Sequence, residues 1–183
     1  MTARISPGTA RELGLPAYLL SRVAGRVTRT QPPAVFTTLG RGRRTFWGWL
    51  GFAASVLAPW GPLSRREQEL VILRVAHLRD SDYEWSHHTR LGRRAGVTSA
   101  ELEWLRAASL QTWLDQTWAP REQAMLAATD ALVTTHDLDD EAWARLREHL
   151  SERETVDLLM LVGQYDMLAT TLRVLRLAPD PPR

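Results

Sequence analysis

The sequence predicts an all-α fold, and three observations support this prediction. Four Ser/Thr-x-x-Glu boxes, a pattern typical of helix starts, begin at Thr9, Ser64, Thr98 and Ser151. No run of about four to eight residues alternates between apolar and polar side chains, and glycine-rich hairpin loops are missing. The chain has 183 residues, 44% of them hydrophobic, which suits one compact domain with its own core.

The first part of the chain differs in character from the rest. Residues 1–45 combine four prolines with short apolar clusters, and a single helix is expected near Pro16–Thr28. We therefore expect these residues to form an arm over a helical domain of residues 46–177. Residues 178–183 are rich in proline and are expected to form a flexible tail.

After the arm, the predicted helices follow one another closely. Ser64–Arg79 is apolar almost all round apart from Glu69 and His77, as expected of a helix inside a bundle. The next helix is capped by Asp80 or Ser81 and ends at Gly96. Further helices are expected at Ser99–Leu110, Pro120–Thr135, Asp139–His149 and Ser151–Arg176.

A faint internal similarity links two of these helix starts. Ser64-Arg-Arg-Glu-Gln resembles Pro120-Arg-Glu-Gln, and each opens a helix that is followed by a shorter capped one. The matching stretch is too short to predict a duplication.

Composition removes several kinds of chemistry. The chain has no cysteine, so a disulfide framework, a thiolate metal site and a thiol nucleophile are all excluded. All 23 of its basic Lys or Arg residues are arginines, which excludes a lysine Schiff base. The formal net charge is only +2, so we interpret the basic cluster Arg41–Arg44 as a solvated turn and expect no nucleic-acid partner.

The sequence gives no indication of a membrane protein. The longest apolar stretch, Phe46–Pro59, is about 14 residues long, whereas a spanning helix needs ~20. The N-terminal residues lack the apolar core of a signal peptide. We therefore expect a cytoplasmic protein with no membrane partner.

The helix that starts near Ser81 carries titratable side chains where apolar ones are expected. Leu91 and Ala95 define its buried stripe, and extending this stripe backward reaches His88, His87 and Glu84. Burying such groups costs several kcal/mol unless they are paired, so their presence indicates a function or a specific pair. Two structural alternatives remain: Glu84 and one histidine form only an i,i+4 pair, or one histidine faces solvent.

A metal site is the less favoured interpretation of the same residues. Glu84-x-x-His87 has the spacing used by di-iron bundles, but the chain has no second Glu-x-x-His. The His-Glu-x-x-His pattern of zinc proteases is also absent. We therefore predict no metal and no other cofactor.

Several stretches together resemble the carboxymuconolactone decarboxylase family, which includes the AhpD-like alkylhydroperoxidases. The resemblance covers most of the chain and implies an AhpD-like helical bundle that oligomerises through helix faces. The matching stretches are Leu63–Ala76 (Leu-Ser-Arg-Arg-Glu-Gln-Glu-Leu-Val-Ile-Leu-Arg-Val-Ala), Tyr83-Glu84-Trp85-x-x-His88, Ala95-Gly96-Val97, Leu161–Leu168 and Pro33-x-x-Phe36.

In the peroxidase branch, the resemblance implies an upstream Glu, a Cys-x-x-Cys pair and a His four residues after the second Cys. The Glu corresponds to Glu69, the two cysteines to Ser81 and Glu84, and the histidine to His88. Neither a serine hydroxyl nor a carboxylate can cycle through sulfenic acid and disulfide. The chain is therefore not expected to reduce peroxides in the AhpD manner.

The residues that remain form an acid–base set on two neighbouring helices. The decarboxylase branch, as the resemblance implies, releases CO2 from a lactone acid without a cofactor. We expect the same class of reaction here, decarboxylation or isomerisation of a carboxylated lactone or enol acid. The expected roles are His88 as general acid/base, Glu84 orienting and charging it, Glu69 positioning a water or substrate, and Ser81, Tyr83 and His87 lining the pocket.

Two expectations concern partners. The substrate is a small molecule, and the chain forms a homo-oligomer, a dimer, trimer or hexamer, in which the aromatic-rich segment 46–60 offers an apolar surface. The competing hypothesis is a non-catalytic binding or assembly protein that keeps the fold and uses Glu84 and His88 only structurally.

Overall fold

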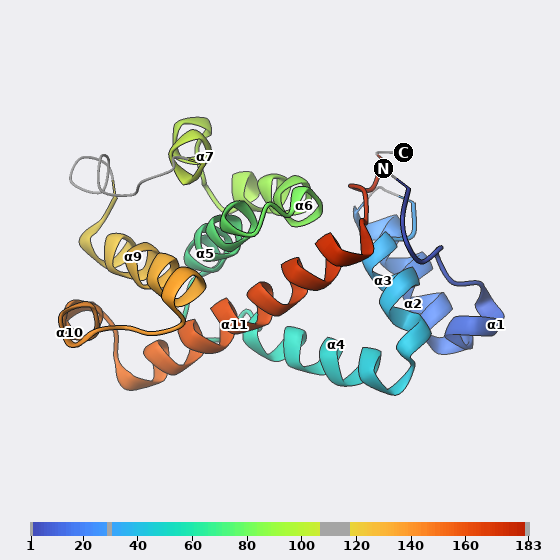
Figure 1. Ribbon diagram of the computed structural model, residues 1–183, viewed down its shortest axis with the longest axis horizontal. Coiled ribbons are helices and arrows are strands. Elements are labelled where there is room, and N and C mark those ends of the chain that lie inside the picture. Colours follow the sequence, from blue (N-terminus) through green and yellow to red (C-terminus); the bar gives the residue numbers. More distant parts are fainter. Residues whose placement is uncertain (1, 29–30, 107–117, 182–183) are drawn as a thin grey trace.

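The computed structural model describes residues 2–28, 31–106 and 118–181, and these residues form helices and connecting turns without any strand. The prediction of an all-α fold is confirmed for this part of the chain. Helix α11 (Glu152–Leu175) runs diagonally through the middle of the molecule (Figure 1). Helices α5 (Arg65–Leu78) and α6 (Asp82–Arg94) lie on one side of α11, and α4 (Arg44–Val56) lies on the other (Figure 1).

Helix α5 is the centre of the core. Every residue from Gln68 to Ala76 is buried, because α5 packs against α6, α7 (Ser99–Leu105), α9 (Pro120–Thr135) and α11. This confirms the prediction of a helix inside a bundle. The helix expected at residues 99–110 is described only as far as Leu105, since residues 107–110 lie outside the described residues.

One charged residue within α5 is part of this packing. Arg74 is fully buried, and its guanidinium forms two 2.6 Å hydrogen bonds to the carboxylate of Asp130 on α9. It also donates to the carbonyl of Leu105 at 2.8 Å. A two-pronged arginine–carboxylate pair of this kind fixes geometry as well as charge. Arg74 therefore ties α5 to both α7 and α9.

The predicted capping boxes form the helix starts. Ser64, Thr98 and Ser151 each accept from the backbone N–H three residues later, and the glutamate at that position reaches back to the cap. Thr9 opens the short α1 (Ala10–Leu13) with the same box. Helix α10 (Asp140–His149) corresponds to the helix expected at Asp139–His149, and Asp139 is its N-cap.

A tight turn folds α6 back onto α5. The N–H of Ser81 bonds to the carbonyl of Ala76 at 2.8 Å, and that of Asp80 bonds to His77 at 3.0 Å. Asp80 has the left-handed φ of 48° that this Schellman pattern requires. The same pattern ends α6, where Gly96 has a φ of +89°. Because the turn is short, the buried face of α6 lies against α5.

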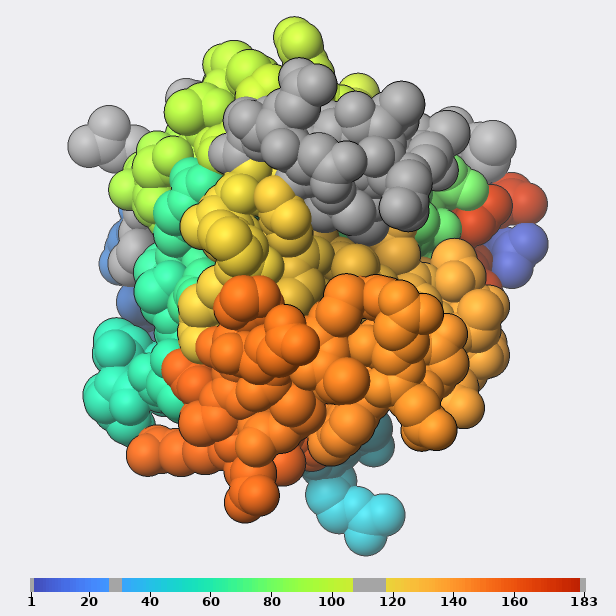
Figure 2. Space-filling view, turned by 90° about the vertical axis from the view of Figure 1, so that its left-hand side faces the viewer, coloured from blue at the N-terminus to red at the C-terminus, as the bar shows by residue number. Residues whose placement is uncertain are grey.

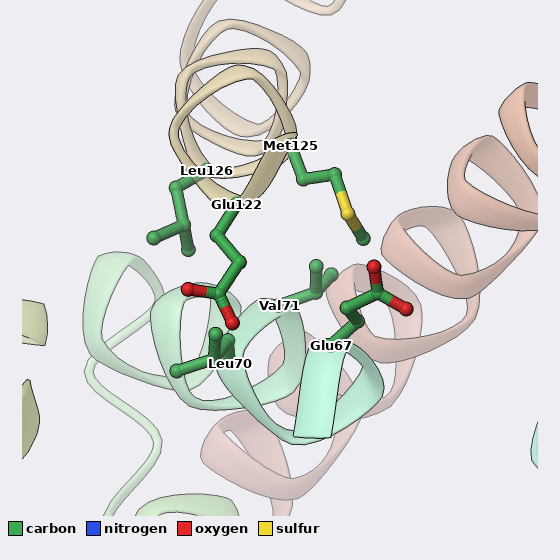
Figure 3. Close-up of a pocket in the computed structure, with 6 residues that line it drawn as sticks. All are labelled: Glu67, Leu70, Val71, Glu122, Met125 and Leu126. Carbon is green, nitrogen blue, oxygen red and sulfur yellow. The ribbon is translucent and has the colours of Figure 1, made fainter. Parts of the chain in front are cut away.

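The two similar helix starts face each other in space. Arg66 on α5 bonds to Glu122 on α9 at 2.7 Å, and Arg121 on α9 bonds to Glu67 on α5 at 2.6 Å. Figure 3 shows Glu67 and Glu122 projecting from these two helices around a gap that has no room for a water molecule. The gap is packing space between α5 and α9.

Each of these two arginines also binds a glutamate that lies two helices further along the chain. Arg66 also binds Glu101, the capping-box glutamate of α7, and Arg121 binds Glu154, the capping-box glutamate of α11. Each arginine also donates to a carbonyl two residues before that box, at Gly96 and His149 respectively. Residues 64–105 and 119–175 are thus arranged as two related halves, which the faint sequence similarity was too short to predict.

The N-terminal segment is more helical than the sequence indicated. Where a single helix was expected, it forms α1, α2 (Leu15–Thr28), α3 (Ala34–Leu39), a 3₁₀ turn at Gly40–Gly42, and the start of α4. Short helices with few periods carry little pattern, which explains why α3 was missed. That residues 1–45 form a unit separate from residues 46–177 stays a prediction.

The basic cluster and the tail both make specific contacts. Arg41 pairs with Glu12, and Arg43 donates to the carbonyls of Arg11 and Glu12, so this turn holds α1 in place. The carboxylate of Asp180 accepts from the N–H of Ala34 at 2.9 Å and from the hydroxyl of Tyr83 at 2.6 Å. Asp180 thus contacts α3 and α6, and the expectation that residues 178–183 form a flexible tail stays a prediction.

Two further features concern one end of the molecule and its longest helix. One end is covered by α9, α10 and the first turns of α11 (Figure 2). By length and composition alone α11 could cross a membrane, but it is a core helix here, with buried residues from Thr155 to Leu172.

Trp47 and Trp60 are 45% and 82% exposed. Association through their segment stays a prediction, which size-exclusion chromatography with light scattering tests.

Candidate functional site

The turn between α5 and α6 brings three predicted residues together. His88 of α6 lies with Nδ1 at 2.7 Å from Oε2 of Glu69 on α5. Its other nitrogen, Nε2, lies 3.3 Å from Oε2 of Glu84, one turn earlier on α6. Glu69, Glu84 and His88 are 0%, 4% and 5% exposed. They form a buried carboxylate–imidazole–carboxylate chain.

This geometry determines the charge of the ring. A carboxylate accepts and does not donate, so an imidazole whose two nitrogens both face carboxylates is expected to carry a proton on each and to be positively charged. Burial alone would lower the pKa of His88, but the hydrogen bonds and negative charges of Glu69 and Glu84 outweigh it and raise the pKa to about 9. His88 is therefore an imidazolium at neutral pH.

A fourth charged residue extends the chain. Arg65, one helical turn before Glu69 on α5, forms an ion pair with Oε1 of Glu69 and also donates to Gln68. Its side chain remains 44% exposed. Two cations and two carboxylates therefore alternate in the order Arg65, Glu69, His88, Glu84, which offsets the cost of burying each charge.

Two aromatic residues complete the surroundings of His88. Tyr165 of α11 packs edge-on against the His88 ring, with centroids 5.2 Å apart. Burial, followed by the charges of Glu84 and Glu69, raises the pKa of Tyr165, so its phenol stays protonated. Burial, together with the positive charges of His88, Arg90 and Arg65, lowers the pKa of His87 to about 3, so this imidazole is neutral.

A cavity of about 430 Å³ lies beside this chain of charges. Its volume is within the usual range for small-ligand pockets, roughly 300–1,000 Å³. Arg65, Glu84, His87, His88 and Tyr165 contribute to its wall. The remaining lining residues are mostly apolar: Leu20, Val23, Ala24, Pro33, Val35, Phe36, Trp49, Leu50, Ala53, Ala54, Leu57, Tyr83, Leu91 and Leu168.

Two of the expected positions need correction. Glu69 does not line the cavity, because it is fully buried between Arg65 and His88 and cannot position a substrate directly. Ser81 lies outside the same cavity and lines a second hollow of about 580 Å³, beside Asp80 and Arg173. Tyr83 lines both spaces.

The helical stripe that led to these residues was displaced by one position. Tyr83, Glu84, His88 and Gly92 are the buried residues of α6, whereas Leu91 is only half-buried. Gly92 lies so close to α5 that a Cβ atom at this position would be 3.2 Å from Leu73. Both histidines reach the cavity, His88 from within the core and the half-buried His87 from the side.

Sequence reasoning missed three parts of the site. Arg65 belongs to the Ser64 capping region and precedes Glu69 by four residues, a spacing that could have indicated an ion pair. Tyr165 lies in a stretch that was noted only for its resemblance to the family. The apolar wall from α2, α3 and α4 had no signal, because it depends on how distant helices pack.

No group of three or more His, Asp and Glu residues that could hold a metal ion is found within residues 2–28, 31–106 and 118–181. Both nitrogens of His88 are already occupied by carboxylates. That the site works without metal or cofactor stays a prediction.

The fold and the site define a single-domain α-helical protein with a buried carboxylate–imidazole cluster beside a cavity of about 430 Å³. Residues 43–131 match the model of the carboxymuconolactone decarboxylase family. The uncharacterized protein YdfG of Bacillus subtilis (strain 168) is 28% identical over 107 residues, which cover 57% of this chain and 69% of YdfG.

Solved structures share the whole fold. The alkylhydroperoxidase AhpD core protein of Ralstonia eutropha JMP134, described as an uncharacterized peroxidase-related protein, superposes with a TM-score of 0.82 at 16% identity. The match covers 97% of this chain and 92% of that one. The debrominase Bmp8 superposes with a TM-score of 0.76 at 14% identity, covering 98% and 93% of the two chains. The predicted AhpD-like fold is confirmed.

Proposed function

We propose that this protein is a small-molecule enzyme that moves protons without a cofactor, using Glu84 and His88 at the end of the apolar cavity. The observation that carries the proposal is the charged His88, held between two carboxylates, of which only Glu84 also lines the cavity. A cation with a pKa near 9, connected to a carboxylate at a cavity wall, can supply a proton to a bound molecule.

The second half of the molecule supports a functional interpretation of these charges. Counted from the helix N-caps, Glu69 corresponds to Ala124 on α9, and Glu84 and His88 correspond to Ala142 and Leu146 on α10. Leu146 is fully buried. The same helix arrangement is thus built there with apolar side chains, so the packing itself does not require buried charges. Polar groups that break such a pattern are more often functional.

The chemistry follows from the order of the groups. In a decarboxylation, the bond to the carboxylate carbon breaks, CO2 leaves, and its electron pair forms an enolate in the cavity. His88 passes a proton through Glu84 to the enolate carbon, and solvent returns one proton to His88. In an isomerisation, Glu84 instead removes a proton from one carbon and returns it to another. Glu69 and Arg65 act through His88 by keeping it charged and in place.

The substrate class is proposed to be a carboxylated lactone or enol acid. The match to the family model supports this choice, and the absence of cysteine excludes thiol-based peroxide reduction in this chain. The relatives with the same fold include a debrominase and a peroxidase-related protein, so the fold by itself does not select a reaction.

Proton exchange in D2O tests the proposal before the natural substrate is known. A panel of lactone acids and β,γ-unsaturated acids is incubated with the protein, and proton NMR follows deuterium incorporation at carbon and release of CO2. We expect catalysed exchange for at least one member and a loss of about 100-fold or more in Glu84→Gln. The matched control Glu141→Gln, an exposed glutamate on α10, should keep full activity.

Exchange that persists in both Glu84→Gln and His88→Gln would contradict the proposed roles. The competing candidate is a non-catalytic binding protein, which is favoured by one observation: both His88 nitrogens already face carboxylates inside the protein, Nδ1 in a hydrogen bond to Glu69 and Nε2 in an ion pair with Glu84. Such a protein would bind members of the panel in the cavity and give no exchange above the rate in its absence.

A further inference from the structure

The cavity has two unlike walls. Its polar wall is formed by side chains from α5, α6 and α11, which include all the charged groups that reach the cavity. Its other wall comes from α2, α3 and α4 and is apolar apart from the indole N–H of Trp49, which is buried without a partner among the described residues; Trp49 and Phe36 pack edge-to-face at 6.0 Å between centroids. Val23, 52% exposed, is also among the lining residues. A molecule in this cavity therefore has one polar end and an apolar body.

The charges at the polar end do not cancel. Of the charged groups that line the cavity, Arg65 and His88 are cations and Glu84 is a carboxylate, whereas Glu69 lies behind them and does not line it. The lining groups thus have a surplus of one positive charge. Arg90 lies outside the lining, with its Nη2 at 3.4 Å from Nδ1 of His87. His87, neutral and lining the cavity, has its Nδ1 turned to Arg90 and so carries its proton on Nε2 as a donor.

We propose that the cavity selects monoanions with a flat apolar body of one or two rings, whose acidic group lies at Arg65 and His87 and whose body lies against Phe36, Trp49 and Ala53. This inference deepens the proposed function, on which it rests, by narrowing the proposed carboxylated lactones and enol acids to monoanions with an apolar ring body. One anionic group matches the surplus charge and the exposed guanidinium of Arg65. A second carboxylate would lie against the apolar wall without a cation to pair with, which is unfavourable.

Three related probes test this selection by titration calorimetry. They share the naphthalene body and differ in charge: 2-naphthoate, 2-naphthamide and naphthalene-2,6-dicarboxylate. We expect 2-naphthoate to bind in the cavity, and the amide and the dicarboxylate to bind at least about tenfold more weakly. Equal or tighter binding of the dicarboxylate would overturn the proposal, and so would an absence of 2-naphthoate binding to the folded protein.

Matched variants place the probe in the cavity. Ala53→Trp fills the space at the apolar wall and should abolish binding of 2-naphthoate, while Ala144→Trp on the exposed face of α10 should not change it. Binding that survives Ala53→Trp with unchanged affinity contradicts the proposed location.

A second pair of variants tests the contact between the anionic group of the ligand and the guanidinium of Arg65. Arg65→Met should weaken 2-naphthoate by about tenfold and leave 2-naphthamide unchanged, and Arg65→Lys should recover most of the loss. Arg145→Met, which removes an exposed arginine from α10, is the control. If Arg65→Met weakens both probes equally, the guanidinium does not select the anion and this part of the proposal is wrong.

The binding test is independent of turnover. Glu84→Gln should bind 2-naphthoate as tightly as the unmodified protein or more tightly, because it removes a negative charge from the polar end. If this variant binds 2-naphthoate selectively and the unmodified protein catalyses no exchange, the proposed ligand class is supported and the proposed enzyme activity is refuted. If the unmodified protein catalyses exchange but shows no preference for monoanions, the enzyme activity is supported and the ligand class is refuted.

Discussion

The two halves of the molecule begin alike and continue differently. Helices α5 and α9 exchange arginine–glutamate pairs at their starts, through Arg66 with Glu122 and Arg121 with Glu67. In the first half, the helices then carry a buried charged cluster, and in the second half alanine and leucine occupy the corresponding positions. The comparison separates what the fold needs, the paired helix starts, from what the cavity uses, the charges.

The largest expected effect comes from removing one member of the cluster. His88→Leu leaves Glu69 and Glu84 buried and without their shared cation, which should lower the free energy of unfolding by about 3–5 kcal/mol. The triple variant Glu69→Ala, Glu84→Ala, His88→Leu copies the second half and should recover most of this loss. Urea unfolding followed by circular dichroism measures both.

The triple variant is also the control for function. It should be folded, with a stability close to that of the unmodified protein, and should have no exchange activity. A triple variant that is as unstable as His88→Leu would show that the charged cluster is needed for packing, against the comparison of the two halves.

A pH dependence of stability is the next largest effect. The pKa of His88 rises from an unfolded value of 6.5 to about 9, so its stabilisation is fully present below pH 6.5 and is lost as pH rises through 9. Between these values the free energy of unfolding should fall by roughly 3 kcal/mol. Denaturant midpoints at pH 6.5, 8 and 9.5 measure the slope, which should disappear in the triple variant; an unchanged slope there assigns it to other groups.

The smallest effect concerns the shared helix starts. Arg66→Met and Arg121→Met each remove a partly exposed arginine that binds two glutamates, and each should cost about 1 kcal/mol of unfolding free energy. The two losses should be similar, because the two arginines occupy related positions. Urea midpoints compare them directly, and a several-fold difference would show that the halves are not equivalent in energy.

Local signals made much of the fold predictable. The capping boxes at Ser64, Thr98 and Ser151 are short-range patterns, and they fixed the helix starts. The charged cluster was predictable because Glu84 and His88 lie one turn apart and the turn at Asp80 is short. By contrast, the apolar wall, the contact of Asp180 with Tyr83 and the pairing of the two halves join residues far apart in sequence.

The protonation state of His88 is the most direct test of the central claim, that a positively charged His88 can supply a proton through Glu84 to a molecule in the cavity. Nitrogen-15 NMR of the imidazole follows it between pH 6 and 10, with and without 2-naphthoate. We predict that both nitrogens carry protons at pH 7, that the ring titrates near pH 9, and that 2-naphthoate shifts this titration. A ring that is neutral at pH 7, or one whose titration does not respond to 2-naphthoate, would contradict the central claim.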